Sequence, residues 1–389
     1  MSIIITNARI LTHGRVTERG FVYAEEGVIA EVREGRPPRD LRADTYINAR
    51  QQVVMPAFVD AHTHACWAGD RVDEWEKRLA GASYLELLES GGGIMSTVRA
   101  TREASREHLT ELLLERLAIF LEQGTTTLEI KSGYGLSTEH ELKMLHAISD
   151  ASDRWEGTIV PTALLAHAID PDQPDFVETT IVETLDAVHR EFPHIAVDAY
   201  CEKGAWSLEQ CRRLFERASE LGHPCRVHAD QFNSLGMTSW AIDHGFRSVD
   251  HLEASSGEDV ARLGESETCA VALPCSGFHT DDRYADGRAL LDAGGSLVIA
   301  TNCNPGSAPT SSMPLAIGLA TRKMGISAHE AIDASTRTPA SLLDCNDRGV
   351  IERGKRADLI ILRHSDERLL AHDLGGNPVE AVIVNGELV

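Results

Sequence analysis

The sequence predicts an α/β protein made of a (β/α)8 TIM barrel and a small discontinuous β domain formed by both termini. Two observations support this prediction. Residues 53–346 alternate short apolar strands with helical segments, and polar side chains recur where those strands end. Residues 1–52 and 347–389 contain strand-like segments and turns instead. Repeated βα units form parallel barrels, whose functional groups come from the carboxyl ends of different strands.

The terminal segments have the composition of paired strands. Residues 2–12 and 21–32 are rich in branched and aromatic residues, with a turn at Glu26-Gly27. Residues 357–362 and 379–389 resemble them, with a second turn at Asn385-Gly386. Because chain termini often lie close together, we expect the two ends to pair into one domain.

The middle of the chain shows helix and strand signals in succession. Residues 105–123 carry a leucine-rich stripe at helical spacing and end before Gly124, and residues 125–130 read as the next strand. Ser207 and Gln210 form a capping box at the start of another helix. A doubly wound sheet is the alternative, but no G-x-G-x-x-G follows the first strand, and we interpret Gly91-Gly92-Gly93 as a loop. Further strands are expected at residues 225–227, 247–249, 269–273 and 296–301.

The composition of the chain indicates which kinds of ligand or macromolecule it can bind. The chain has 389 residues, 42% of them hydrophobic, and a formal net charge of −23. This charge disfavours nucleic acid and anionic membranes as partners, so an acidic ligand would need a local Arg or Lys. The eight cysteines include no C-x-x-C pair, and we find no signal peptide or apolar run long enough to span a membrane. We therefore expect a reduced, cytoplasmic protein.

A metal site is predicted after the first barrel strand. The apolar run from Val53 to Asp60 reads as a strand buried on both faces and leads to His62-Thr63-His64. In a strand, side chains two residues apart point the same way, so both imidazoles can face one ion. Other polar residues also fall at strand ends, namely Lys131, His167, Glu202, His228, His251 and Asn302.

These residue types suit metal-assisted hydrolysis. His62, His64 and His228 are the ligands that Zn²⁺ or iron prefers, and a fourth position would hold water. The metal would lower the pKa of that water toward about 7. A neighbouring carboxylate could then pass the proton to a leaving nitrogen, and His251 could polarise a carbonyl or stabilise negative charge.

Several motifs together resemble one family. They are Phe58–His64, Ala68-Gly69-Asp70-Arg71, Gly91–Ile94, Lys131–Leu136, Ala166–Ala168, Cys201–Gly204, His228–Gln231, Asp250–Glu253, Asn304-Pro305-Gly306 and Gly354–Leu359. On these residues the chain resembles the imidazolonepropionases of the amidohydrolase superfamily. H-x-H marks only the superfamily, whereas A-G-D-R with K-S-G-Y-G-L and N-P-G is much narrower.

The resemblance implies hydrolysis of 4-imidazolone-5-propanoate to N-formimino-L-glutamate, a step of histidine degradation. It also implies a homodimer with a single Zn²⁺, Fe²⁺ or Fe³⁺ per subunit and an unmodified Lys131. The implied metal ligands are His62, His64, His228 and Asn302, and the implied catalytic residues are Gln231, His251 and Asn302. Arg71 suits the carboxylate tail of such a heterocyclic substrate because it can bind it bidentately, and a surface ion pair is the alternative role for this arginine. The implied substrate-binding residues are Arg71, Tyr134, His167, Gln231, Asn304, Gly306 and Ser307.

Position 302 departs from the family pattern, which has Asp as ligand and proton shuttle. Asn302 is neutral and cannot accept a proton at neutral pH. Three explanations stay open: an introduced Asp→Asn change that traps a ligand, a natural enzyme for a modified ring such as thio-imidazolone propionate, or a homologue that only binds. A different amidohydrolase, such as a deaminase, shares H-x-H but lacks support from the narrower motifs.

A second departure lies in residues 274–282, which we expect to form a loop after the seventh strand. His279, Asp281 and Asp282 add titratable groups there, and any of them could replace the missing base; a solvated loop is the alternative. Cys66, Cys275 and Cys303 are further candidates near the pocket, either as soft ligands or nucleophiles or as inert buried thiols.

Overall fold

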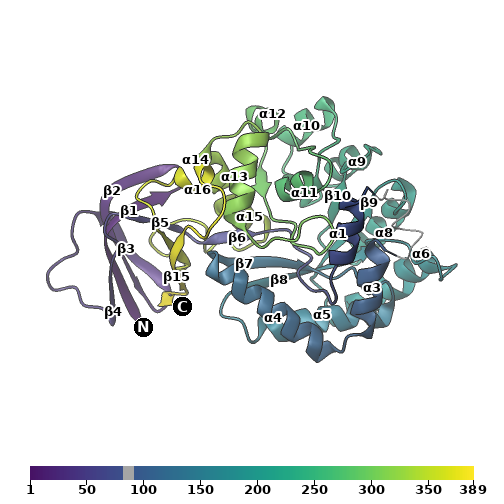
Figure 1. Cartoon of the computed structure of the whole chain (residues 1–389), viewed down its shortest axis with the longest axis horizontal. Coiled ribbons are helices and arrows are strands. Elements are labelled where there is room, and N and C mark those ends of the chain that lie inside the picture. Colours follow the sequence, from purple (N-terminus) through teal and green to yellow (C-terminus); the bar gives the residue numbers. More distant parts are fainter. Residues whose placement is uncertain (82–91) are drawn as a thin grey trace.

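The computed structural model describes residues 1–81 and 92–389 and contains two eight-stranded sheets. Figure 1 shows the first sheet at one end of the molecule, with both chain termini in it, and the barrel at the other end. The first sheet consists of β1 (Ser2–Thr12), β2 (Arg15–Glu25), β3 (Val28–Glu34), β4 (Thr45–Asn48), β5 (Val53–Pro56), β14 (Leu359–Leu362), β15 (Val379–Val384) and β16 (Glu387–Leu388).

This first sheet joins the two ends of the chain. Its path runs β16-β15-β14-β5-β1-β2-β3, and β4 pairs with β1 in parallel. The chain reverses between β15 and β16 at Asn385 and Gly386, which both adopt a positive φ, as the predicted turn requires. A core of aliphatic side chains holds the sheet together, among them Ile5, Ile10, Val22, Leu359 and Ile361. The prediction that both termini build one β-sheet is confirmed.

The apolar run that we predicted as one strand is divided between the two sheets. β5 pairs with β1 and β14 in the terminal sheet, whereas β6 (Phe58–Asp60) begins the barrel. The domain boundary predicted at residue 53 therefore falls inside the terminal sheet, and the chain crosses to the barrel at Ala57. The break could not be seen in the sequence because every residue from Val53 to Val59 is apolar and buried.

The second sheet is the predicted barrel. Its order is β13-β12-β11-β10-β9-β8-β7-β6, with parallel pairing throughout. Its ends meet through backbone hydrogen bonds from Asn302 to His62 and from His64 to Cys303. The remaining strands are β7 (Thr125–Lys131), β8 (Thr158–Ala166), β9 (Ala196–Cys201), β10 (Arg226–Ala229), β11 (Ser248–His251), β12 (Cys269–Ala272) and β13 (Leu297–Ile299).

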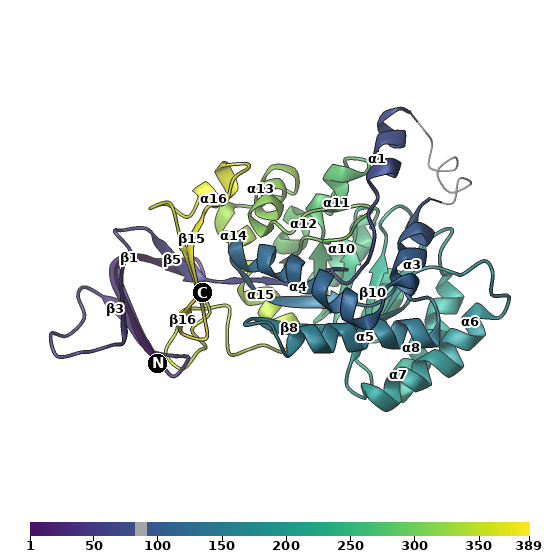
Figure 2. The ribbon, with the colours of Figure 1, turned by 60° about the horizontal axis from the view of Figure 1, so that its bottom comes forward.

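Helices surround this barrel, and Figure 2 shows α4, α5 and α8 lying along one side of it. The predicted leucine-rich helix is α4 (Arg106–Glu122), and the predicted capping box at Ser207 and Gln210 begins α8 (Leu208–Glu220). The others are α1 (Val72–Leu79), α3 (Ile94–Glu103), α5 (Thr138–Ser152), α6 (Phe176–Thr179), the π-helix η1 (Thr180–Thr184), α7 (Leu185–Glu191), α9 (Met237–Asp243), α10 (Gly257–Gly264), α11 (Pro274–His279), α12 (Gly287–Asp292), α13 (Met313–Lys323), α14 (Ala328–Asp333), α15 (Arg337–Leu342) and α16 (Leu369–His372).

Both segments predicted as loops contain or adjoin a helix. Residues 274–279 form the short helix α11, with Pro274 in its first turn, rather than the loop that we expected. Gly91 of the predicted glycine loop lies outside the described residues, whereas Gly93 is the N-cap of α3 with φ 72°. Within residues 1–81 and 92–389, no helix combines the length and the apolar character needed to cross a membrane.

Candidate metal centre and active site

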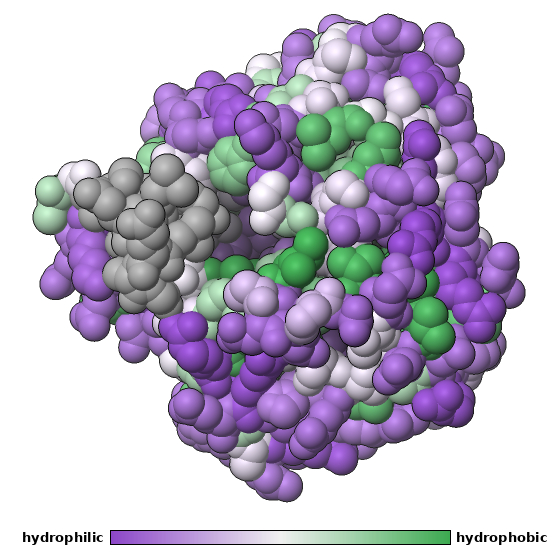
Figure 3. All heavy atoms as spheres, turned by 90° about the vertical axis from the view of Figure 1, so that its right-hand side faces the viewer, coloured by the Kyte–Doolittle hydropathy of each residue, from purple (hydrophilic) through white to green (hydrophobic). Residues whose placement is uncertain are grey.

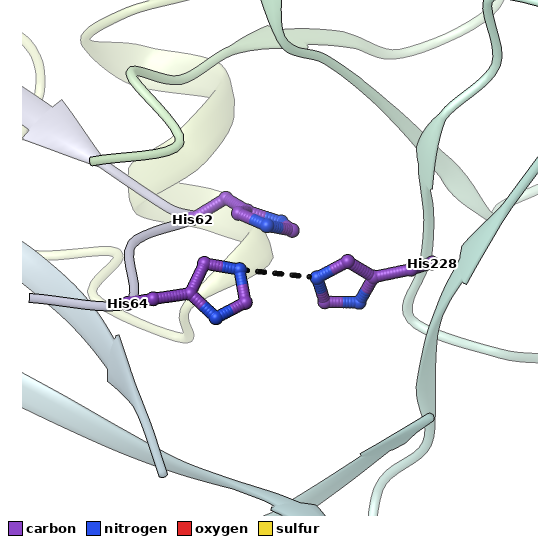
Figure 4. A group of neighbouring side chains, drawn as sticks. All are labelled: His62, His64 and His228. Atoms are coloured by element: carbon purple, nitrogen blue, oxygen red, sulfur yellow. Dashed lines mark hydrogen bonds between the residues drawn. The ribbon is translucent and has the colours of Figure 1, made fainter. Parts of the chain in front are cut away.

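Three histidines meet at the carboxyl end of the barrel. His62 and His64 follow β6, and His228 lies in β10. The ring centroids of His62 and His228 lie 4.5 Å apart, and His64 lies 5.3 Å from each of them. One ligand atom from each residue lies within 4.8 Å of the others. Figure 4 shows the rings pointing toward one another, with 3.3 Å between Nε2 of His64 and Nε2 of His228. The predicted convergence of these imidazoles is confirmed.

The cluster fits a tetrahedral metal ion. Two nitrogens bound to one zinc at about 2.0–2.1 Å lie about 3.4 Å apart, close to the separation of His64 and His228. His62 Nε2, His64 Nδ1 and Asn302 Oδ1 are buried without a hydrogen-bond partner in the described chain. Burial, reinforced by nearby positive groups, lowers the pKa of His62 and His64 well below its ordinary value, so both rings are neutral ligands.

Two buried carboxylates orient these rings from behind. The Nδ1–H of His62 donates to Asp250 Oδ2 at 2.6 Å, and the Nδ1–H of His228 donates to Asp198 Oδ1 at 3.1 Å. Each carboxylate therefore fixes its histidine in the tautomer that leaves Nε2 as the lone-pair donor. This pairing of carboxylate and histidine is the usual support of a metal-binding imidazole.

The carboxylates are balanced by two cations inside the barrel. Alternation along β10 turns Arg226 toward the interior on the same side as His228, and Arg226 Nη2 donates to Asp250 Oδ2 at 2.9 Å. Lys131 Nζ lies 2.8 Å from Asp198 Oδ2 and 2.7 Å from Glu129 Oε1. Both contacts are made by the ammonium group, and an unmodified Lys131 stays a prediction. Burial would raise the pKa of Asp198, but His228 and Lys131 lower it well below its usual range.

Asn302 lies beside the cluster at the end of the eighth barrel strand. Its backbone N–H donates to the carbonyl of His62 at 3.1 Å, and its φ of 56° is in the left-handed region. Its carbonyl accepts from Asn304 Nδ2 at 2.7 Å, whereas its own Oδ1 is buried and unpartnered within the described chain. The amide oxygen can therefore serve as a neutral ligand, but it supplies no base.

His251 ends β11, and Gln231 follows β10. The His251 ring lies 6.0 Å from His62 and 5.6 Å from His228, and its Nδ1–H donates to the buried Glu253 at 3.1 Å. This leaves Nε2 of His251 for other contacts. Gln231 Oε1 accepts from the hydroxyl of Tyr200 at 2.8 Å, which orients the carboxamide.

Tyr134 and His167 lie on the opposite side. The His167 ring stacks on His64 with centroids 4.9 Å apart, and Tyr134 lies 5.2 Å from His167. The Nδ1–H of His167 donates to the carbonyl of Gly133 at 3.0 Å, so its Nε2 is an acceptor. Burial is the largest cause that lowers the pKa of His167 to about 3.

Arg71 lines a pocket of about 410 Å³ together with Trp67, Trp75, Arg116 and Gly306. Figure 3 shows a hollow in the face of the barrel end. The Nε and Nη2 atoms of Arg71 already bind Glu74 at 2.7 and 2.5 Å. A substrate carboxylate would therefore have to displace Glu74 or approach through Nη1, which faces Gly306.

The Asn304–Ser307 turn is held by Asn304 itself. Asn304 Oδ1 accepts from the backbone N–H groups of Gly306 and Ser307, both at 2.8 Å. Its Nδ2 donates to the Asn302 carbonyl and the Ser307 hydroxyl. Because this carboxamide is fully engaged, Asn304 shapes the turn that presents Gly306 beside Arg71.

Comparisons with known proteins agree with this geometry. A family model described as "Amidohydrolase family" matches residues 74–389. An imidazolonepropionase from Herpetosiphon aurantiacus is 43% identical over 360 residues, which cover 89% of this chain and 84% of the relative. One from Chloroflexus aggregans is 38% identical over 398 residues, which cover 98% of this chain and 91% of the relative.

The chain belongs to the imidazolonepropionase family of amidohydrolases. Solved structures share its fold at low identity. A triazine hydrolase variant matches with a TM-score of 0.79 and 18% identity, covering 100% of this chain and 94% of that one. An atrazine chlorohydrolase from Arthrobacter aurescens TC1, complexed with zinc, matches with a TM-score of 0.74 and 16% identity, covering 99% and 94%.

In this imidazolonepropionase-family site, the three candidate replacements for a base have different surroundings. Asp281 forms an ion pair with Arg283, and Asp282 binds Lys323 at 2.8 Å on the surface. His279 stacks on Trp75 with ring centroids 4.7 Å apart, and it lines the same pocket as Arg71. The two carboxylates are thus engaged in surface ion pairs, whereas base replacement by His279 stays a hypothesis.

The cysteines near the site are buried thiols. Burial raises the pKa of Cys66 and of Cys303 to about 12. The pKa of Cys275 is also raised, with the same cause. All three are therefore protonated at neutral pH, as expected for inert thiols rather than for nucleophiles.

Several polar residues that support the site were missed as functional candidates. Asp198 and Tyr200 lie on β9, and Glu253 and Glu74 each accept from a residue that was predicted. A buried Asp in the apolar strand 196–201 was the available signal for Asp198. Tyr200 had none, because it meets Gln231 only in the folded chain, and the local pairs of Glu253 with His251 and of Glu74 with Arg71 carried no pattern that distinguishes them from surface residues.

Proposed function

We propose that the protein hydrolyses 4-imidazolone-5-propanoate to N-formimino-L-glutamate, as the family resemblance implied. The convergence of His62, His64 and His228, two of them braced by carboxylates, is the observation that carries this proposal. We further propose a single Zn²⁺ or iron ion per subunit, held by these histidines and the Asn302 amide oxygen. Such an ion supplies Lewis-acid polarisation and a water of lowered pKa.

The chain's own residues would bind and orient the ring. His251 donates its Nδ1–H to Glu253, so its Nε2 would donate only in the doubly protonated imidazolium, which could stabilise charge on the ring carbonyl or pass a proton to the leaving nitrogen. Gln231 is oriented by Tyr200 and offers its Nε2 as a donor. His167 Nε2 offers an acceptor for a ring N–H, because Nδ1 is committed to Gly133.

Arg71 would bind the propionate. The same pocket is lined by Arg78 and Arg116 and by the acidic Asp70 and Glu74, so its cations exceed its carboxylates by one although the chain carries a net charge of −23. Such a local field favours the approach of an anionic substrate. Gly306 leaves room beside Arg71, since a Cβ there would lie 3.2 Å from Nη1.

Asn302 favours a second candidate function. With no carboxylate at this position, the protein would act on a modified ring such as thio-imidazolone propionate, or would bind an imidazolone ring with little turnover. A cytoplasmic homodimer in histidine degradation remains our expectation from the family.

Turnover assays separate these candidates. The metal-loaded protein is mixed in single-turnover amounts with imidazolone propionate or its thio analogue, and ring absorbance and product are followed. Hydrolysis of the oxo ring supports the first proposal, and hydrolysis of the thio ring alone supports the second. Tight binding of either ring without any product would refute the enzymatic proposal.

A further inference from the structure

The segment from Gly133 to Leu136 carries Tyr134 to the metal centre. It connects β7 to α5, and its backbone is unusual, with φ of 112° at Gly133 and 46° at Leu136. The Tyr134 ring lies 6.1 Å from His64 and 5.2 Å from His167. The position of this ring therefore depends on what fixes the flanking backbone.

A single buried carboxylate binds the backbone on both sides of Tyr134. Glu141 Oε2 accepts from the N–H of Gly133 at 2.9 Å. Glu141 Oε1 accepts from the N–H groups of Gly135 and Leu136, each at 2.8 Å. Glu141 is 1% exposed, so these charge-assisted bonds are shielded from water.

The glycines of the motif follow from this contact. The φ of Gly133 disfavours any L side chain. A Cβ on Gly135 would lie 2.5 Å from the backbone nitrogen of Glu141. Tyr134 is therefore flanked by glycines because both neighbours must bring their N–H groups to the same carboxylate.

The carbonyls of the same segment are bound from the other side. Arg102 Nε donates to the Gly135 carbonyl and Arg102 Nη2 to the Leu136 carbonyl, both at 2.7 Å. The Gly133 carbonyl accepts from His167 Nδ1 at 3.0 Å. Glu141 thus binds the N–H groups of the segment, whereas Arg102 and His167 bind its carbonyls. The bond to the Gly133 carbonyl holds His167 in the tautomer that leaves Nε2 without a hydrogen.

We propose that Glu141 is a positioning residue, which holds Tyr134 and His167 in their substrate-binding geometry by binding the backbone of residues 133–136. It acts through these two side chains and not through contact with the substrate or the metal. The proposal rests on the proposed function for the roles of Tyr134 and His167, but the backbone clamp itself does not depend on the substrate.

The test compares Glu141→Gln with Glu139→Gln, which removes an equal charge from an exposed position on the same helix. In Glu141→Gln, the new carboxamide would turn an N–H₂ group toward backbone N–H donors. We expect faster hydrogen exchange of residues 132–136, unchanged metal content, and a loss of kcat/KM of about 10²-fold, the effect of misplacing a binding group by about 1 Å. Glu139→Gln should behave like the wild type.

A double-mutant cycle separates positioning from general damage. In a Tyr134→Phe background, Glu141→Gln should reduce kcat/KM less than in the wild type, because the Tyr134 hydroxyl is gone and only the effect through His167 remains. Equal losses in both backgrounds, accompanied by a lower Tm, would overturn the positioning role. Unchanged exchange of residues 132–136 in Glu141→Gln would overturn the clamp, even if no imidazolone ring is turned over. Absence of wild-type turnover with altered exchange would instead count against the proposed function alone.

Discussion

Replacing Asn302 by Asp tests the role of the unusual amide. The Asn302 oxygen is buried, unpartnered in the described chain and joined to His62 through the backbone, so a carboxylate there would face the metal cluster. General-base catalysis contributes about 10²–10⁴ in rate, or about 3–5 kcal/mol of barrier. We expect kcat for imidazolone propionate to rise by this factor in metal-loaded Asn302→Asp.

The same substitution has a predicted effect on stability. A buried carboxylate without a partner costs several kcal/mol, and only the metal could offset this charge. The variant should therefore lose more thermal stability than the wild type when the metal is removed by a chelator. Asn302→Ala is the control, since it removes the amide oxygen and adds no base.

Two measurements test these expectations. The first is the rate of hydrolysis under single-turnover conditions, and the second is the Tm with and without a chelator. Unchanged or lower kcat in Asn302→Asp, at equal metal content, would refute the reasoning that position 302 lacks the base. In that case proton transfer would have to use another group, and His251 would be the first to substitute.

Three further changes have definite expected outcomes. Arg71→Ala should raise KM for the carboxylate substrate by roughly 10–150-fold, since a hydrogen bond to a charged group contributes about 1.5–3 kcal/mol, and should hardly affect the corresponding amide. Asp250→Asn should weaken metal affinity by about 10–100-fold, measured by competition with a chelator, because it loosens His62. Glu367→Gln should lower the free energy of unfolding by about 1–3 kcal/mol, because Glu367 bonds Arg9 of β1 and His329 of α14.

The Glu367 effect depends on pH. Burial alone would raise the pKa of Glu367, but the hydrogen bonds from Arg9 and His329 outweigh it and lower the pKa. The stabilisation is therefore present above the ordinary glutamate pKa and is lost as the pH falls through the lowered value. Denaturant titrations from about pH 7 to about pH 3 should show the two proteins converging in acid, and a constant difference would contradict this assignment.

Equal KM increases for the carboxylate and amide substrates in Arg71→Ala would remove Arg71 from the tail-binding role. Unchanged metal affinity in Asp250→Asn would mean that the carboxylate does not orient His62. Lys323→Ala is a suitable surface control for these variants, because it breaks the exposed ion pair with Asp282, away from the barrel interior.

The barrel and its metal ligands could be predicted from the sequence because they depend on short-range patterns. Apolar strands followed by His62, His64 and His228 place the imidazoles at one end of a parallel barrel by topology alone. The capping box at Ser207 was equally local. The division of the run at Ala57 was not predictable, because burial on both sides removes the polar residues that mark a boundary.

The supporting residues of the site depend on contacts between distant segments. Glu141 accepts from the Gly133 N–H only after the chain has turned between β7 and α5, and the sequence does not specify this turn. Arg102 binds the carbonyl of Gly135 from a different helix, α3. The pairing of Arg71 with Glu74 was missed because a separation of three residues in the sequence does not show which N–H groups of the guanidinium are already bonded. Of the base candidates, Asp281 and Asp282 form surface ion pairs, which the sequence could not show because their partners lie in the folded chain, and His279 stays a hypothesis.

We propose that His62, His64 and His228 together hold one catalytic metal ion. Metal analysis of the purified protein and of His228→Ala, both checked for folding by circular dichroism, tests it most directly. We predict about one equivalent in the wild type, as for a single tetrahedral site, and almost none in the folded variant. A folded His228→Ala protein that keeps the full equivalent would contradict the claim.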